Sequence, residues 1–294
     1  MTHLINGKEI ASKLKIELKE EIEELKTKYN DCPCLAVVQV GLNPASSVYV
    51  KSKTKSAKEV GIEISDHHLE ESITEKKLLD LIKDLNSNSK INGILVQLPL
   101  PKHINEQKIL DSIMPEKDVD GFHPVNVGKL SISNSNNNNL LVPCTPFGCL
   151  LMLKQLKIDL VGKNAVIIGR SNIVGKPMAQ LLLKESCTVT IAHSKTKNLE
   201  KISASADILI AAVGRAELIT KEWIKKNAIV IDVGINRIDT NDENKKYKIV
   251  GDVNFEEAKK MAFAVSPVPG GVGPMTIACL LKNTKIAYLN SKTK

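Results

Sequence analysis

The chain has 294 residues, of which 43% are hydrophobic and 25% are charged, a composition typical of a globular protein with one large domain or two ordinary ones. Its formal net charge is +8, but lysines are spread among acids and only 3% of residues are aromatic, which argues against nucleic-acid binding. No apolar run is long enough to span a membrane, and the N-terminus lacks the layout of a secretion signal. We therefore expect a cytoplasmic protein with neither nucleic acid nor membrane as a partner.

The six cysteines give little sign of a metal site. Only Cys32 and Cys34 are close together, and no second pair or nearby histidine completes a ligand set. We predict no metal and expect thiols in a reducing compartment.

Strands and helices alternate through the first half of the chain. Helical spacing of apolar residues covers 10–29, a buried strand covers 34–42, and Asn43-Pro44 is a break. This alternation predicts parallel strands joined by crossover helices. The elements that follow are a helix over 46–61, a weak strand over 62–69, a helix over 73–86 and a strong buried strand over 91–100.

A second alternating series follows the Asn-rich segment 131–139, which we predict to be a loop. We expect an α/β fold with two domains, 1–142 and 143–273. A C-terminal helix of about 274–290 is expected to pack back on the first domain. The second series comprises helices near 146–157 and 175–185 and strands over 163–168, 187–192, 207–214, 228–234 and 248–253.

The stretch GRSNIVGKP, residues 169–177, lies between a predicted strand and a helix, where a dinucleotide fold holds a pyrophosphate. It is a weak match to G-x-G-x-x-G because the middle glycine is missing. The nucleoside triphosphate pattern G-x-x-x-x-G-K-[ST] fails, since the spacing is one residue too long and Pro177 replaces the hydroxyl. A plain structural turn remains an alternative.

The next strand favours NADP over NAD. NAD-binding domains place an acid about 20 residues after the glycine turn, and residues 189–195 contain none. Arg170, Ser194 and Lys195 instead offer a cation and hydrogen-bond donors of the kind expected around a 2′-phosphate.

Six stretches in order resemble the bifunctional methylenetetrahydrofolate dehydrogenase/methenyltetrahydrofolate cyclohydrolase family: YVKSK, ILVQLPLP, PEKDVDGFHPVNVGKL, PCTPFG, IIGRSNIVGKPMAQLL and SPVPGGVGPMT. The resemblance runs from about residue 3 to residue 288. It implies a homodimer of two-domain α/β subunits, with a tetrahydrofolate derivative in the cleft between the domains and NADP on the second domain, 143–273, which is of the Rossmann type. The implied reactions are oxidation of 5,10-methylenetetrahydrofolate to the 5,10-methenyl form and hydrolysis to 10-formyltetrahydrofolate, in the one-carbon metabolism that serves purine, methionine and histidine biosynthesis.

The resemblance also implies the folate site. Tyr49 and Lys53 are four residues apart and share one helix face, although a run of lysines on a helix is usually a solvated surface. By resemblance, Tyr49 is the aromatic platform beside the folate and Lys53 manages proton transfers, tuned by a hydrogen bond with Gln97. Asp120 receives the N–H donors of the pterin ring. The alternatives are a capped strand end for Gln97 and, for Asp118, a structural role.

On the cofactor side, the resemblance assigns phosphates to the glycine turn, the 2′-phosphate to Ser194, and the nicotinamide to two later residues. The glycines of PGGVG let the backbone approach the ligand, or they form only a tight turn. The implied cofactor residues are Gly169, Arg170, Ser171, Ser194, Ile235 and Thr276, and the implied substrate contacts in the last loop are Pro269, Gly270 and Gly271.

Two reactive residue types have simpler explanations. We expect His193 to contact the cofactor or fill space, and Cys144 to be structural, because neither reaction needs a covalent intermediate. Two rival functions remain: a dehydrogenase that uses NAD or lacks hydrolysis, and a non-catalytic nucleotide-binding or nucleic-acid-binding protein.

Overall fold

The computed structural model describes residues 2–42, 44–133, 139–242 and 245–293. The chain forms two compact units, each named here for its parallel sheet. The three-stranded unit comprises Ser12–Cys144 and Ile277–Lys294, and the six-stranded unit comprises Met1–Ala11 and Thr145–Thr276.

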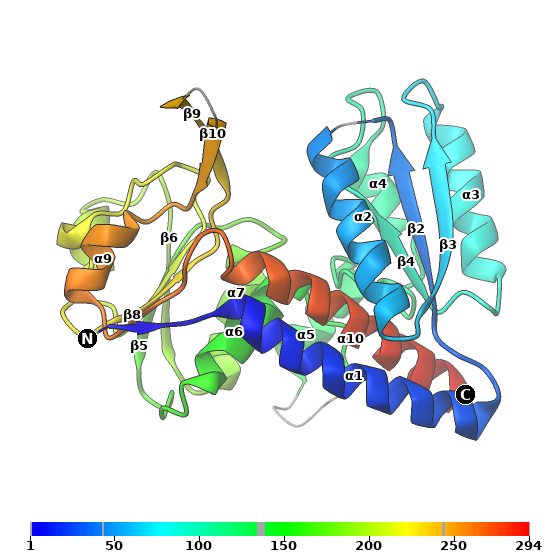
Figure 1. Ribbon diagram of the computed structural model, residues 1–294, viewed down its shortest axis with the longest axis horizontal. Coiled ribbons are helices and arrows are strands. Elements are labelled where there is room, and N and C mark those ends of the chain that lie inside the picture. The colour runs from blue at the N-terminus through cyan, green and yellow to red at the C-terminus, as the bar shows by residue number, and fades with distance from the viewer. Residues whose placement is uncertain (1, 43, 134–138, 243–244, 294) are drawn as a thin grey trace. The chain divides into compact units, whose positions relative to one another are not determined.

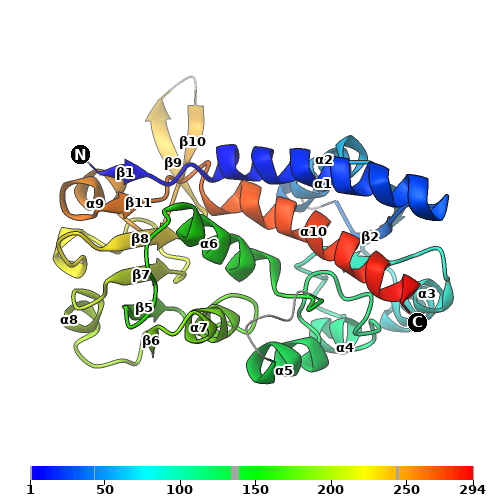
Figure 2. The same ribbon diagram turned by 90° about the horizontal axis from the view of Figure 1, so that it is seen from below.

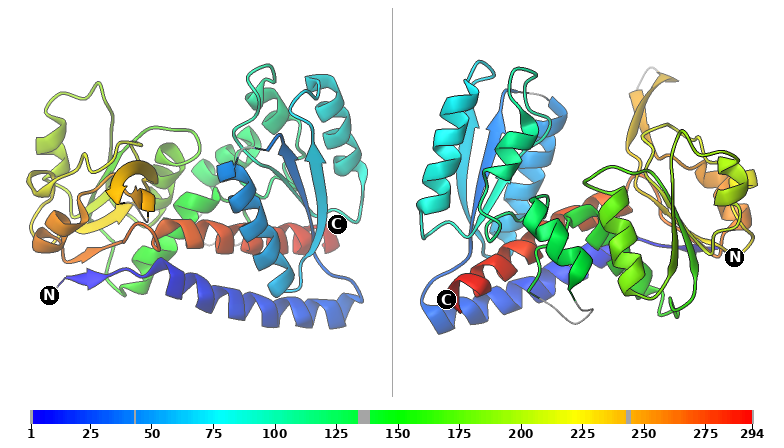
Figure 3. Two further views of the ribbon diagram at one scale, coloured as in Figure 1. Left: turned by 45° about the horizontal axis from the view of Figure 1, so that its top comes forward. Right: turned by 180° about the vertical axis from the view of Figure 1, so that it is seen from behind.

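The three-stranded unit is built on strands β2 (Cys34–Val40), β3 (Glu63–Leu69) and β4 (Gly93–Val96), in the order β3-β2-β4 and all parallel. Every residue of β2 is buried, as expected for a central strand covered on both faces. Helices α2 (Pro44–Glu59) and α3 (Glu75–Ser87) lie on opposite sides of this sheet (Figures 1 and 3).

Two long helices, α1 (Gly7–Tyr29) and α10 (Val272–Lys292), run side by side in Figures 1 and 2. Ion pairs join Lys285 to Glu21 at 2.6 Å and Lys292 to Asp31 at 2.7 Å. The C-terminal end of α10 therefore belongs to the three-stranded unit although it is far from that unit in sequence. The short helices α4 (Glu106–Asp111) and α5 (Pro124–Ile132) complete the unit.

The six-stranded unit has one parallel sheet in the order β1-β11-β8-β7-β5-β6. Helices α6 and α7 lie on one face and α8 and α9 on the other (Figure 2). Because β5 pairs with β6 on one side and β7 on the other, the direction of winding reverses there, the usual position of a ligand crevice in such sheets. The bounds are β1 His3–Leu4, α6 Cys144–Gln155, β5 Asn164–Ile168, α7 Gly175–Lys184, β6 Thr188–Ala192, α8 Leu199–Ser203, β7 Ile208–Ala211, the 3-10 helix η1 Lys221–Trp223, β8 Ile229–Asp232, α9 Phe255–Met261 and β11 Ala264–Val265.

One predicted strand has a different partner from the one that the alternating pattern indicates. Residues 248–253 fall partly in β10 (Lys245–Val250), which pairs antiparallel with β9 (Asn236–Asp242) in a separate two-stranded sheet (Figure 1). An alternating pattern marks a strand but does not choose its neighbour.

The expected α/β class is confirmed, since both units are parallel sheets covered by helices. Boundaries differ where proline acts: α2 begins at Pro44, a favoured first helical residue, and β4 ends before the two prolines that follow it. Of the predicted loop 131–139, Ser131 and Ile132 still belong to α5, and 134–138 lie outside the described residues, as does Asn43. In the described part of the chain, no helix is both long and apolar enough to cross a membrane.

Candidate functional site

Lys53 and Gln97 come together in the three-stranded unit. The Nζ of Lys53, on α2, donates a hydrogen bond of 3.0 Å to Oε1 of Gln97, which follows β4. Lys53 is only 8% exposed. The Gln97 amide in turn donates to the carbonyl of Leu98 at 2.6 Å, and its backbone N–H donates to Val38 at 2.9 Å. The sheet therefore fixes the acceptor to which the buried lysine points.

Asp120 adds a carboxylate to this pair. Burial, with a smaller contribution from the charge of Asp118, raises the pKa of Asp120 to about 6, although the positive charge of Lys53 acts to lower it. Asp118 is itself buried and accepts hydrogen bonds from the backbone of His123 at 2.8 Å and the amide of Asn126 at 2.9 Å. Asp118 thus orders the start of α5, which agrees with a structural role.

Tyr49 lies on α2 one turn before Lys53 and is partly buried. The Tyr49 hydroxyl is protonated at neutral pH in any case, and burial raises its pKa further. An uncharged aromatic ring next to a buried lysine suits stacking against a flat heterocycle.

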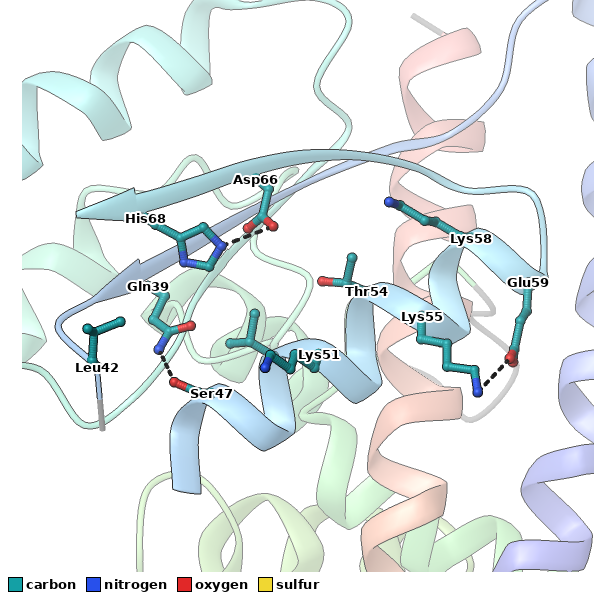
Figure 4. A pocket seen from close by; sticks show the side chains of 11 residues that line it. Gln39, Leu42, Ser47, Lys51, Thr54, Lys55, Lys58, Glu59, Asp66 and His68 are labelled. Carbon is teal, nitrogen blue, oxygen red and sulfur yellow. Dashed lines mark hydrogen bonds and ion pairs between the residues drawn. The ribbon is translucent and has the colours of Figure 1, made fainter. Parts of the chain in front are cut away.

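A cavity of about 830 Å³ opens on another side of α2, towards β3 (Figure 4). Its walls carry the exposed Lys51, Lys55 and Lys58, together with an Asp66–His68 pair at 3.1 Å. None of the four predicted folate-site side chains lines this cavity. The general expectation that a lysine run is a solvated surface therefore holds for this face of α2 and fails for Lys53.

In the six-stranded unit, the predicted phosphate turn is held by close backbone packing. Gly169, directly after β5, has φ +135°, and a Cβ there would overlap the carbonyl oxygen of Ala212. A Cβ at Gly175 would overlap the carbonyl of Gly169. The Ser171 hydroxyl accepts hydrogen bonds from the backbone of Val174 at 3.1 Å and of Gly175 at 3.4 Å. The surrounding backbone leaves no space for a side chain at either position, so glycine is required at both. A loosely packed turn would not require glycine.

Arg170 and Ser194 emerge at the same edge of the sheet. Ile168 of β5 pairs with Ala192 of β6, and each predicted residue follows two positions later and is exposed. His193 accepts a hydrogen bond from the backbone of Lys195 at 3.1 Å through its ring, so it shapes the turn that carries Ser194. This hydrogen bond gives His193 a local structural role, and a contact with the cofactor stays a prediction.

The remaining cofactor residues lie in two places. Ile235 directly follows Gly234 in the motif VGIN, and it is 53% exposed in the loop after β8. Thr276 lies on α10, and its hydroxyl is 3.1 Å from that of Thr145. The nicotinamide contacts of both residues stay predictions.

The predicted substrate contacts in the last loop lie just before α10. Pro269 is exposed, and Gly270 has φ +103°, a conformation that favours glycine. The carbonyl of Gly270 accepts a hydrogen bond from the backbone of Lys8 at 2.9 Å, and a Cβ at Gly271 would approach the carbonyl oxygen of Pro267 closely. The loop is tight, which leaves the ligand-contact role a prediction.

The Cys144 thiol shows no sign of reactivity. The Cys144 thiol donates to the carbonyl of Val119 at 3.3 Å, and burial raises its pKa well above the usual range, which supports a structural role. Within the described ranges, none of the six cysteines is in a disulfide, and no group of three or more metal-ligating side chains is found.

Sequence analysis did not single out two buried acids of the six-stranded unit, Asp232 and Asp252. The sequence could have indicated them, because an acid ends each of the apolar stretches IVID and IVGD. An unpaired charge buried there would be costly.

Comparison with known proteins decides the family. The model described as "Tetrahydrofolate dehydrogenase/cyclohydrolase, catalytic domain" matches residues 5–120, and that described as "Tetrahydrofolate dehydrogenase/cyclohydrolase, NAD(P)-binding domain" matches 143–292. The chain belongs to this tetrahydrofolate dehydrogenase/cyclohydrolase family. The resemblance in the six sequence stretches is therefore confirmed.

Relatives in the tetrahydrofolate dehydrogenase/cyclohydrolase family match over almost the full chain. The Bifunctional protein FolD of Pelagibacter ubique is 56% identical, covering 98% of this chain and 99% of its own. The solved FolD dehydrogenase/cyclohydrolase of Campylobacter jejuni is 50% identical with a TM-score of 0.92, covering 99% and 100%. The Trypanosoma brucei enzyme, solved with NADP cofactor and inhibitor, is 38% identical with a TM-score of 0.94, covering 100% and 99%.

Proposed function

We propose that this chain oxidises 5,10-methylenetetrahydrofolate with NADP and hydrolyses the resulting 5,10-methenyl form to 10-formyltetrahydrofolate, as a bifunctional enzyme of one-carbon metabolism. The observation that carries the proposal is the hydrogen bond of 3.0 Å from the buried Lys53 to Gln97. The family match and the NADP-bound trypanosomal relative support the choice of reaction and cofactor.

Hydrolysis requires proton transfers at a cationic centre. Water bonds to the methenyl carbon and one proton leaves that oxygen. The second proton of the water is then transferred to N5 of the folate as the bond from the carbon to N5 breaks and the formyl C=O forms on N10. Lys53 is the group that exchanges these protons and positions the water, and Gln97 holds its Nζ in place. Tyr49 stacks on the folate, and the Asp120 carboxylate accepts N–H donors of the pterin ring.

Hydride transfer requires position rather than an acid or a base. The nicotinamide C4 must be held near the methylene carbon of the folate. Gly169, Arg170 and Ser171 bind the phosphates of NADP, and Arg170 and Ser194 reach the 2′-phosphate. The remaining contacts of this proposal are Ile235 and Thr276 for the nicotinamide and Pro269, Gly270 and Gly271 for the folate.

Two further properties belong to the proposal: a homodimer as the working assembly and the cytoplasm as its location. The first follows from the resemblance to the family, and the second is supported by the absence of a membrane-spanning helix in the described part of the chain.

A time course with purified protein and 5,10-methylenetetrahydrofolate tests the function, with NADP⁺ or NAD⁺ supplied and both reduced cofactor and methenyl product followed. We expect faster reduction of NADP⁺ and little methenyl accumulation. Stoichiometric accumulation of the methenyl form would remove the hydrolase activity and the role of Lys53. No reduced cofactor at all would overturn the proposed function.

A further inference from the structure

The carboxylate of Asp252 accepts hydrogen bonds from the backbone of the loop that follows β7. Its Oδ2 accepts hydrogen bonds from the N–H groups of Val213 at 2.6 Å and Gly214 at 3.0 Å, and its Oδ1 accepts from the N–H of Arg215 at 2.9 Å. The side-chain amide of Asn236 donates to the same Oδ1 at 2.9 Å. Asp252 is completely buried, so all four donors meet a carboxylate that water does not reach.

Asp232, the last residue of β8, likewise accepts backbone hydrogen bonds, from the loop after β8 and from Asp252 and Val253. Its Oδ1 accepts from the N–H groups of Gly234 and Asp252, and its Oδ2 accepts from that of Val253, each at 2.9 Å. Burial raises the pKa of Asp232 to about 7, against the lowering effect of the N–H groups that it accepts. The two acids are therefore linked, because the backbone of one donates to the carboxylate of the other.

The packing around the two carboxylates leaves no room for larger residues beside them. A Cβ at Gly234 would overlap the Asp252 carboxylate, and a Cβ at Gly251 would overlap that of Asp232. Glycines are thus required on both sides of the pair.

The pair fixes both neighbours of Ile235. Gly234 donates to Asp232, and Asn236 donates to Asp252, while the Ile235 side chain between them is 53% exposed. The loop lies at the carboxyl edge of the sheet. There β8 is next to β7, and β7 is next to the strand that carries the glycine turn. An apolar side chain held out at this edge suits one face of a flat ring.

We propose that Asp232 and Asp252 are positioning residues that hold Ile235 and the loop Val213–Arg215 against the nicotinamide half of NADP. The inference rests on the proposed function, which places Ile235 beside that ring. The acids do not touch the cofactor and act only through the backbone that they bind.

Asp207 provides a matched control. It also accepts a backbone hydrogen bond, from Asn164 at 2.9 Å, and pairs with Lys225 at 2.6 Å. It directly precedes β7, so it lies at the amino end of the strands, away from the loops that follow them. Loss of its charge affects stability without reaching Ile235.

The test compares the full-length variants Asp252→Asn, Asp232→Asn and Asp207→Asn with wild type. An amide keeps the size of the carboxyl group but places an N–H₂ group against backbone donors. We measure Kd for NADP and for adenosine 2′,5′-bisphosphate, which lacks nicotinamide, and the rates of NADP reduction and of methenyltetrahydrofolate hydrolysis. Hydrogen exchange at Val213–Arg215 and Gly234 reports the loops directly.

For the Asp252 and Asp232 variants we expect NADP reduction to fall on the order of 10²-fold and NADP affinity about 10-fold, with faster exchange in both loops. Affinity for the bisphosphate and hydrolysis should stay within about 2-fold of wild type, as should every property of the Asp207 variant except stability. Equal weakening of both ligands, or wild-type NADP reduction, would overturn the inference. If wild-type protein reduces no NADP, the proposed function fails, and the ratio of the two Kd values still decides the positioning role.

Discussion

The candidate sites of the two units differ in whether side chains or backbone form them. In the three-stranded unit, side chains carry the chemistry: a buried lysine, the amide that it contacts and a carboxylate whose pKa is raised to about 6. In the six-stranded unit, the candidate phosphate site is a backbone turn, and its glycines at 169 and 175 have no room for a Cβ. Substitution of Lys53 should therefore change the rate of hydrolysis, whereas substitution in the glycine turn should change NADP affinity and stability.

The largest effect is expected at Lys53. Lys53→Met removes the group that exchanges protons, so hydrolysis of supplied methenyltetrahydrofolate should fall by about 10²–10⁴-fold while Kd for NADP is unchanged. Lys51→Met is the control, because Lys51 lies on the same helix but is exposed. Wild-type hydrolysis by the Lys53 variant would contradict the assignment.

Gly169→Ala tests the backbone half of the comparison. The φ of +135° and the overlap with Ala212 should lower the free energy of unfolding by about 2–4 kcal/mol and weaken NADP binding. Gly162→Ala separates the two causes, since Gly162 has φ +71° but open space around it, and should cost about 1–2 kcal/mol with NADP binding intact. Denaturant titration and NADP titration measure both. If both variants lost the same free energy of unfolding, the overlap with Ala212 would have no energetic effect, and this prediction would be wrong.

Arg170 tests the choice between NADP and NAD. Arg170→Ala removes a charge-assisted contact to the 2′-phosphate and should reduce the preference for NADP by about 10–100-fold, with activity on NAD unchanged. The control is Arg237→Ala, because that guanidinium stacks 3.8 Å from the Tyr247 ring in the β9–β10 hairpin. The ratio of kcat/KM for the two cofactors is the measurement. An unchanged ratio would remove Arg170 from the 2′-phosphate site.

The smallest effect is a gain in stability at Asp120. Because its folded pKa of about 6 lies above the ordinary value of 3.8, ionisation disfavours the folded state, and this cost appears as pH rises between those values. Asp120→Asn should therefore be more stable than wild type by about 1–3 kcal/mol at pH 7 and equal to it below about pH 4, while losing folate affinity. Urea unfolding across this range is the measurement, with the exposed Asp80→Asn as control. A gain that is independent of pH would contradict the raised pKa.

Much of the fold is predictable because it depends on local patterns. Helical periodicity predicts α1 and α3, and apolar runs predict β2, β5 and β8. The two-residue strand β1 is too short for any pattern, and the pairing of β10 with β9 depends on contacts that a single strand does not encode.

The candidate site divides in the same way. Residue types and spacing, read through the family resemblance, predict Lys53 and Gln97, but only the fold shows that one side of α2 buries its lysine while another exposes three. Asp232 and Asp252 are missed because their function depends on backbone donors from three separate segments. The segments are far apart in the sequence, so these hydrogen bonds cannot be predicted before the pairing of the strands is known.

The most direct test of the division between the units puts Lys53→Met and Arg170→Ala through the same two assays. Lys53→Met should lose hydrolysis of supplied methenyltetrahydrofolate and bind NADP with the wild-type Kd. Arg170→Ala should hydrolyse at the wild-type rate and bind NADP more weakly. If both variants lost hydrolysis and NADP affinity together, the two sets of residues would not be separate, and the central claim would be wrong.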